Sequence, residues 1–363
     1  MGAGRARWTG KDGSVARETR FVPVAAGVSL AVDVWPGGAP GVLAVHGLAS
    51  NAQLWWQVAD ELAAAGHAVA AVDLRGHGRS SAPETGYDFE TITGDLLGVL
   101  EALGGETLEA LGDKTVDGAG GPVGAGVAPG PVNGEPSPWA RPIVAGQSWG
   151  GNVVVELARR APERVGGVVC VDGGTIELAE RFSTWEECEA TLAPPVLDGV
   201  SMPRLEGILR AAHPDWPDAG IQATLANMVE QADGTVTARL SRTHHLQILR
   251  SLYGHHPSRC FPELRCGVLF LMAANGDAAW TADKRAGVER ATRLLGSSSA
   301  RWFEGADHDL HAQHPIEVAA AIEEAWAAGL LAPDAGRPRS VAGRAESGAI
   351  FAGARPRRER PAG

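Results

Sequence analysis

The chain has 363 residues, 44% of them hydrophobic, and a formal net charge of −11, a composition typical of a soluble globular protein with one large domain or two smaller ones. The acidic balance argues against nucleic acid as the main partner, because phosphate binding needs a basic face. We expect no membrane association, since no apolar run reaches the roughly 20 residues of a bilayer span. The N-terminal segment is basic but has no apolar core, so we predict no secretory signal and a cytoplasmic location.

The sequence contains no metal or cofactor motif. Its cysteines are too scattered for a disulfide framework and lack the C-x-x-C spacing of many metal sites, so we interpret all four as reduced thiols: Cys170, Cys188, Cys260 and Cys266. The adjacent histidine pairs 244–245 and 255–256 are interpreted as structural, because neighbouring side chains on a helix diverge. We therefore expect neither a metal nor a cofactor.

The first part of the chain alternates short apolar runs with amphipathic stretches, which is typical of an α/β sheet. The expected elements are a hairpin of strands at 21–25 and 28–35, a strand at 41–47, a helix at 53–65, a strand at 68–74 and a helix at 89–103. Gly and Pro then dominate residues 104–138. We interpret this stretch as a mobile surface insertion, because strand-like sequence resumes immediately after it.

The second part continues the same alternation after one interruption. We expect strands at 142–146, 164–174, 267–275 and 299–303, and helices at 150–160 and 282–295. Residues 177–256 interrupt this rhythm with a helical pattern. The last helix is predicted to begin at Pro315, a favourable first-turn residue, and to bury Ile316, Ala319, Ala320 and Trp326. The tail at 335–363 holds seven Arg and two Glu and lacks apolar periodicity, which predicts disorder.

The segment IVAGQSWGGN, residues 143–152, places Ser148 between Gly146 and Gly150, with a predicted strand before it and a helix after it. That is the context of a G-x-S-x-G nucleophile turn. A serine hydroxyl is a weak nucleophile, so it needs a base and an acid that orients the base. Ser148 is therefore the candidate nucleophile.

The candidate base is His308 in FEGADHDLHAQHP, in the loop between the last strand and the last helix. His311 is an alternative, while His314 precedes Pro315 and is typical of a helix entry. The candidate acid is Asp277, which follows a strand directly and gives the chain order Ser, Asp, His.

Asp172, at the end of the strand that follows the elbow helix, is the alternative acid. The predicted oxyanion donors are the backbone N–H groups of Trp149, after the nucleophile, and of Leu48 in the HGLAS turn. Trp280 and Trp185 are candidates for the lining of a largely apolar pocket that binds a small-molecule substrate.

Five motifs follow one another along the chain: HGLASNAQLW, DLRGHGRS, GQSWGG, AANGD and GADHDLHAQHP. Together they resemble the α/β-hydrolase superfamily, in its serine-nucleophile, cap-containing esterase and lipase branch, over about residues 20–330. The resemblance implies a mostly parallel eight-stranded sheet flanked by helices, with a core at 20–176 and 257–330 and a helical cap at 177–256.

By the same resemblance, Ser148, Asp277 and His308 occupy the nucleophile, acid and base positions. DLRGHGRS matches a structural loop of the family, so Arg75 and His77 are not predicted to be catalytic. Similar haloalkane dehalogenases and epoxide hydrolases carry an aspartate at the elbow, and Ser148 argues against both activities.

These observations predict a serine hydrolase that cleaves a small, fairly apolar carboxylic ester or lactone through an acyl-enzyme. Three alternatives stay open: an acyltransferase, a C–C bond hydrolase or perhydrolase on the same triad, and a non-catalytic binding protein with this fold. The sequence predicts no oligomeric state.

Overall fold

The computed structural model describes residues 17–105, 137–197, 199–274 and 278–333. Asp277, the tail at 335–363 and most of the expected insertion at 104–138 lie outside these residues. No helix in the described part of the chain is both long and apolar enough to cross a membrane.

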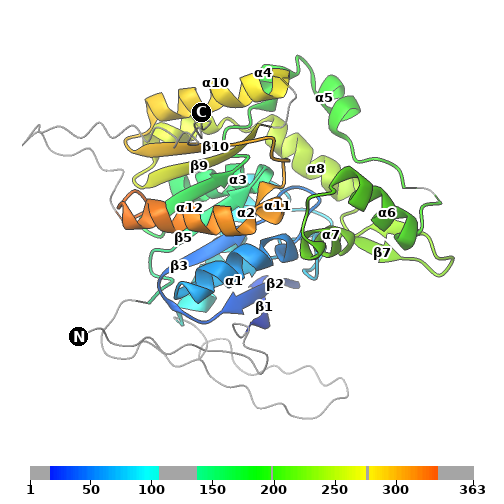
Figure 1. Ribbon diagram of the computed structural model, residues 1–363, viewed down its shortest axis with the longest axis horizontal. Helices are drawn as coiled ribbons and strands as arrows, with labels where there is room; N and C mark the ends of the chain where they lie inside the picture. The colour runs from blue at the N-terminus through cyan, green and yellow to red at the C-terminus, as the bar shows by residue number, and fades with distance from the viewer. Residues whose placement is uncertain (1–16, 106–136, 198, 275–277, 334–363) are drawn as a thin grey trace, which may run out of the picture.

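An eight-stranded sheet forms the centre of the molecule (Figure 1). Its strands are β1 (Glu18–Ala25), β2 (Val28–Trp35), β3 (Gly38–Val45), β4 (His67–Val72), β5 (Ile143–Gln147), β6 (Gly167–Val171), β9 (Gly267–Ala274) and β10 (Ser298–Glu304). The spatial order is β1-β2-β4-β3-β5-β6-β9-β10. The strand β2 pairs antiparallel with β1 and β4, and the other neighbours pair parallel. The predicted mostly parallel eight-stranded sheet is confirmed.

Helices cover both faces of this sheet (Figure 1). On one face, α1 (Trp56–Ala64) and α12 (Pro315–Ala327) pack against strand residues such as Val42 and Ala44. On the other face, α2 (Phe89–Gly104), α3 (Trp149–Arg160) and α10 (Ala278–Leu294) pack against residues such as Leu43 and Val45. Successive strand residues point to opposite faces, so a sheet covered on both sides needs strands that are apolar throughout.

The last helix begins at Pro315 as predicted. Its predicted apolar side is confirmed at Ala319 and in part at Trp326, which is half-buried, but was wrong at two positions. Ile316 is 63% exposed, and Ala320 is exposed as well. The buried side instead comprises Val318, Ala319, Ala321, Ile322 and Ala325. Small alanines on both sides leave the helical periodicity ambiguous, and only the direction of the sheet decides which side is buried.

The chain between β6 and β9 leaves the sheet (Figure 1). It forms α4 (Leu178–Arg181), α5 (Trp185–Leu192), α6 (Met202–Ala212), α7 (Asp218–Leu225), β7 (Met228–Glu230), β8 (Val236–Ala238), α8 (Arg242–Tyr253), α9 (Pro257–Cys260) and a 3₁₀ turn, η2 (Phe261–Glu263). The short antiparallel pair β7–β8 was not predicted from the helical pattern. Its connection contains Asp233 and Gly234, a turn-forming pair. The domain bounds of the cap stay a prediction.

Candidate active site

Ser148 lies in the sharp connection between β5 and α3. Its backbone has φ +54° and ψ −123°, a strained conformation for a residue with a side chain and one that tends to mark functional sites. The flanking glycines permit the turn. A Cβ atom on Gly146 would overlap the carbonyl of Gly150, and a Cβ on Gly150 would overlap the carbonyl of His46. The spacing of the two glycines is therefore a steric requirement of the turn.

The imidazole of His308 lies beside the serine hydroxyl. His308 Nε2 is 2.8 Å from Ser148 Oγ, within the reach of a proton transfer. The His308 side chain is 49% exposed, so solvent and small molecules can reach it. The structure brings neither alternative histidine to Ser148: His311 is buried beside Trp55, and His314 stacks near Phe303.

The loop that carries His308 connects β10 to α11 (Leu310–Gln313) and is held from several directions. Gln147 Nε2 donates to the His308 carbonyl at 3.3 Å, and the Asp307 N–H donates to Gln313 Oε1 at 2.7 Å. From the segment between β6 and β9, Trp216 Nε1 lies 2.9 Å and His213 Nδ1 lies 2.8 Å from Asp307 Oδ2. These contacts fix the loop beside the nucleophile.

The carboxylate at the other side of the imidazole belongs to Asp172. Its Oδ2 lies 2.6 Å from His308 Nδ1, and its backbone has φ +43° directly after β6. The structure thus places the alternative acid at the base. Asp277, the acid first predicted, lies outside the described residues.

Lys284 is a site residue that the sequence analysis missed. Its ammonium group donates to Asp172 Oδ2 at 2.7 Å and to the Ala273 carbonyl at 3.1 Å. The Ala273 N–H donates to Asp172 Oδ1 at 3.0 Å. Lys284 lies on α10, and no local pattern links it to Asp172. Three donors from separate segments therefore fix the buried carboxylate.

Neighbouring charges and hydrogen bonds lower the pKa of Asp172 and raise the pKa of His308. Burial alone would raise the pKa of Asp172, but hydrogen bonds from His308 and Lys284 outweigh it and lower that pKa. Desolvation alone would lower the pKa of His308. The hydrogen bond to Asp172 and the negative charge of Asp309 raise it above 6.5, against a smaller opposing effect of Lys284. Asp172 is therefore ionised at neutral pH, and it increases the basicity of His308.

The HGLAS turn lies against the nucleophile. A Cβ atom on Gly47 would be 3.1 Å from Ser148 Cβ. Ala49, with φ +59°, donates its N–H to His77 Nε2 at 3.3 Å, and His77 Nδ1 bonds the Arg75 carbonyl at 2.9 Å. The segment DLRGHGRS thus supports this turn. Leu48 and Trp149 are next to Gly47 and Ser148, and their role as oxyanion donors stays a prediction.

The two tryptophans predicted to line a pocket contact arginine and tyrosine side chains in the structure. Trp280 stacks under the Arg181 guanidinium at 3.5 Å. Trp185 packs edge-on against Tyr253 at 5.9 Å and lies 4.8 Å from the Arg250 guanidinium. A cavity of about 440 Å³ is lined by other residues, among them Trp216, and its lining does not include Ser148. A role of Trp280 and Trp185 in the substrate pocket stays a prediction.

The family model of the alpha/beta hydrolase family matches residues 42–321. The chain belongs to the alpha/beta hydrolase family. A curated relative, an epoxide hydrolase A of Mycobacterium tuberculosis, is 42% identical over 77 residues, or 21% of this chain and 24% of that protein. The chain thus matches about a quarter of the length of that relative.

Two solved structures of similar fold match the alpha/beta hydrolase chain over most of its length. One is an E-2-(acetamidomethylene)succinate hydrolase, with a TM-score of 0.61 and 21% identity over 85% of this chain and 98% of that one. The other is an esterase of M. tuberculosis, with a TM-score of 0.59 and 21% identity over 86% of this chain and 92% of that one. At this identity the two likenesses show the fold.

Proposed function

We propose that this protein is a serine hydrolase that cleaves small carboxylic esters or lactones through an acyl-enzyme. The observation that carries the proposal is the continuous hydrogen-bonded chain from Ser148 Oγ through His308 to Asp172, with distances of 2.8 and 2.6 Å. It joins a nucleophile, a base and an orienting acid, the three roles that serine chemistry requires. Membership of the alpha/beta hydrolase family supports the same reading.

In the proposed reaction, His308 Nε2 accepts the proton of Ser148 as Oγ attacks the acyl carbon. Asp172 accepts the Nδ1–H of His308, which holds the ring in the tautomer whose Nε2 is free to accept, and stabilises the imidazolium that forms. His308 then gives its proton to the departing alcohol oxygen. A water molecule, deprotonated by His308, attacks the acyl-enzyme. His308 then returns this proton to Ser148 Oγ as the acid leaves, which regenerates the free enzyme.

The negative charge of the tetrahedral intermediates needs N–H donors beside Ser148. We propose the backbone N–H groups of Leu48 and Trp149. The contact of Gly47 with Ser148 supports the first donor, and the position of Trp149 at the start of α3 supports the second.

The identity of the nucleophile favours esters over epoxides. A serine that opens an epoxide forms an ether, which water and an imidazole do not cleave, whereas an acyl-serine ester is readily hydrolysed. The similarity to epoxide hydrolases covers a minor part of either chain. We therefore propose an acyl substrate.

Replacement of Ser148 by Ala tests the proposal directly. A fluorophosphonate should label the unmodified protein on Ser148 and leave S148A unlabelled. Hydrolysis in a panel of p-nitrophenyl esters and lactones of varied acyl length should fall by about 10⁴-fold to 10⁶-fold in S148A. Full activity in S148A would refute the assignment.

Two further assays separate the alternatives on the same triad. Styrene oxide should not be turned over, and its hydrolysis in a Ser148-dependent reaction would overturn the choice of substrate class. An added alcohol or amine should leave the free acid as the main product. A predominant ester or amide product would instead identify an acyltransferase.

A further inference from the structure

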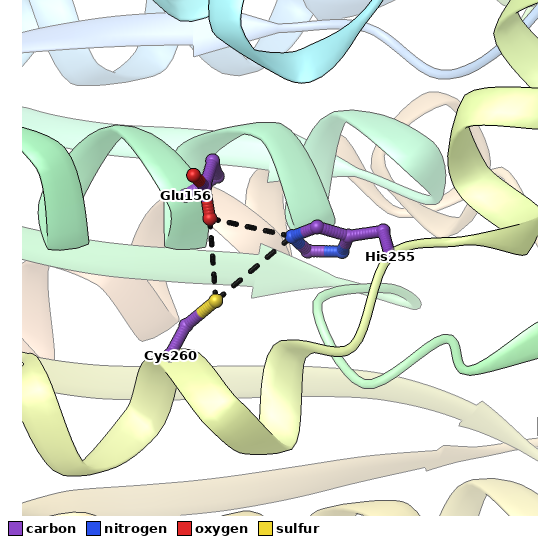
Figure 2. A group of neighbouring side chains, drawn as sticks. All are labelled: Glu156, His255 and Cys260. Atoms are coloured by element: carbon purple, nitrogen blue, oxygen red, sulfur yellow. Dashed lines mark hydrogen bonds and ion pairs between the residues drawn. The ribbon is translucent and has the colours of Figure 1, made fainter.

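A second group of chemically reactive side chains lies two turns along α3 from Ser148. Glu156 projects from α3, His255 follows α8, and Cys260 ends α9. Figure 2 shows the three side chains pointing toward one another from these separate segments. The carboxylate and imidazole side chains are each 8% exposed, and Cys260 is buried. The proposed hydrolysis uses none of them.

The donor atoms of this Glu156–His255–Cys260 cluster have the spacing of metal ligands. Glu156 Oε2 lies 3.3 Å from Cys260 Sγ and 3.5 Å from His255 Nε2, and the sulfur lies 3.9 Å from that nitrogen. A circle through the three atoms has a radius of about 2.1 Å. Zinc bonds are about 2.0–2.2 Å to nitrogen or oxygen and about 2.3 Å to sulfur, and tetrahedral donors then lie about 3.4–3.6 Å apart. A cation close to the plane of the three atoms would reach all of them.

The chemistry of the donors fits the same class of cation. A thiolate, an imidazole and a carboxylate are the ligands that Zn²⁺ and Co²⁺ prefer. The thiolate and the carboxylate offer two negative charges to the cation, and the Glu156 charge is shared with the guanidinium of Arg159. Arg159 already holds the Glu156 carboxylate, at 2.6 Å from Oε1 and 3.0 Å from Oε2, so the ligand oxygen is also oriented.

Two protons occupy the metal-free cluster. Asn152 Nδ2 donates to the Ile176 carbonyl at 2.8 Å and lies 3.2 Å from His255 Nδ1, so the imidazole proton sits on Nε2 and faces Glu156. The Cys260 thiol donates to Glu156. Burial and the neighbouring carboxylate raise the pKa of Cys260 to about 12. Without metal, this cluster is a closed hydrogen-bond network.

We propose that the cluster binds one thiophilic divalent cation of the Zn²⁺ class through Glu156 Oε2, His255 Nε2 and Cys260 Sγ, with water as the fourth ligand. The Cys260 thiol proton is released to solvent. The imidazole proton transfers from Nε2 to Nδ1 by exchange with solvent. The Asn152 amide rotates to accept it and gives up its hydrogen bonds to the Ile176 carbonyl at 2.8 Å and from the Ile176 N–H at 3.4 Å. One proton is therefore released for each cation bound. The bound cation links α3 to the connection between α8 and α9.

The first test uses Co²⁺ alone, added to the full chain after treatment with a chelator. One equivalent should produce a sulfur-to-cobalt charge-transfer band, and one equivalent of Zn²⁺ should displace it and raise Tm. Cys260→Ser should abolish the band. Cys188→Ser, which removes another buried thiol, should keep it. Absence of the band from the unmodified protein, or its persistence in C260S, would overturn the proposal.

A gain-of-affinity variant keeps the proposal testable if C260S fails to fold. Asn152→Asp supplies a carboxylate that accepts the Nδ1–H of His255, the usual partner of a zinc-bound histidine. The variant also loses the buried hydrogen bond from residue 152 to the Ile176 carbonyl, so the Tm of its metal-free form is measured first to establish that it folds. We expect N152D to bind Co²⁺ about tenfold more tightly than the unmodified chain. Equal or weaker binding by a folded N152D would contradict the proposed ligation by His255.

Discussion

At the scale of single residues, the candidate site depends on atoms that the fold brings together from distant parts of the chain. Ser148, Asp172 and His308 come from three different strand ends, and Lys284 comes from a helix. The carboxyl ends of parallel strands meet at one edge of a sheet, where ligands bind in open α/β folds. None of these side chains is a strong nucleophile or base by itself. Their reactivity comes from the short hydrogen bonds that join Ser148 to His308 and His308 to Asp172.

Asp172→Asn tests which carboxylate orients the base. The amide carries no negative charge, so it neither stabilises the His308 imidazolium nor holds the proton on Nδ1 as the carboxylate does. We therefore expect kcat for an ester substrate to fall by about 10³-fold to 10⁴-fold. The comparison is Asp277→Asn, measured on the same substrate. A large loss in D277N with little loss in D172N would reverse the proposed assignment.

Lys284→Met tests how the ammonium charge beside Asp172 affects the pKa of His308. The groups that face His308 include Asp172, Asp309 and the ammonium of Lys284, which opposes the protonation of the imidazole. Without that ammonium, the pKa of His308 rises further above 6.5. His308 must be neutral to accept a proton, so the acid limb of kcat/KM should move to higher pH.

The profile should be measured between about pH 5 and about pH 9. Relative to the unmodified protein, K284M should lose more activity at the acid end of this range than at the alkaline end. Lys284→Arg retains the charge and is the matched control. An acid limb that stays in place, or moves to lower pH, would contradict this view of Lys284.

At the scale of elements, the strand–serine–helix turn is the feature that positions the nucleophile. Its geometry follows from backbone segments that approach too closely for side chains at Gly146 and Gly150. The elbow also aims the N-terminus of α3 at the same point, where backbone N–H groups and the helix dipole favour negative charge.

Gly146→Ala should disrupt this element. The added methyl group would overlap the Gly150 carbonyl, so we expect the free energy of unfolding to fall by about 3 kcal/mol, with loss of fluorophosphonate labelling. The control is Gly94→Ala on α2, where nothing lies within 4 Å of the new atom. That variant should gain about 0.5–1 kcal/mol, because alanine favours a helix. Urea unfolding measures both, and equal effects would argue against the steric explanation.

At the scale of the whole molecule, several buried histidines are held neutral by the fold. Burial lowers the pKa of His46 and His245 to about 4 and that of His311 to about 3, and the pKa of His77 also lies well below 6.5. The unfolded chain exposes the same imidazoles to water, where their pKa is about 6.5. Protonation therefore favours the unfolded state below that pH.

Stability should accordingly fall as pH decreases from about 6.5 toward 4, because the unfolded state binds more protons across this range. The expected loss is a few kcal/mol in urea unfolding between about pH 7 and about pH 4.5. His311→Phe removes one of these groups, whose ring nitrogens have no hydrogen-bond partner among the described residues, and should reduce the slope. A urea midpoint that stays constant over this range would contradict the prediction.

The sequence by itself determined the sheet, the elbow and the order of the motifs. Apolar runs of strand length and the glycine spacing around Ser148 are local signals, because backbone geometry depends on neighbouring residues. His308 could be chosen for the same reason, since it follows the last predicted strand. The sequence also excluded an aspartate nucleophile, because the residue at the elbow is readable directly.

Only the tertiary structure decided which carboxylate meets His308, that Lys284 holds it, and that Glu156, His255 and Cys260 converge. The contacts of Asp172 with His308 and Lys284, and of Glu156 with Cys260, join residues about a hundred or more positions apart, and no periodicity encodes such pairs. The buried side of α12 was undecidable for a related reason: alanine fits either side of a helix, and only the sheet beneath it makes one of them the interior.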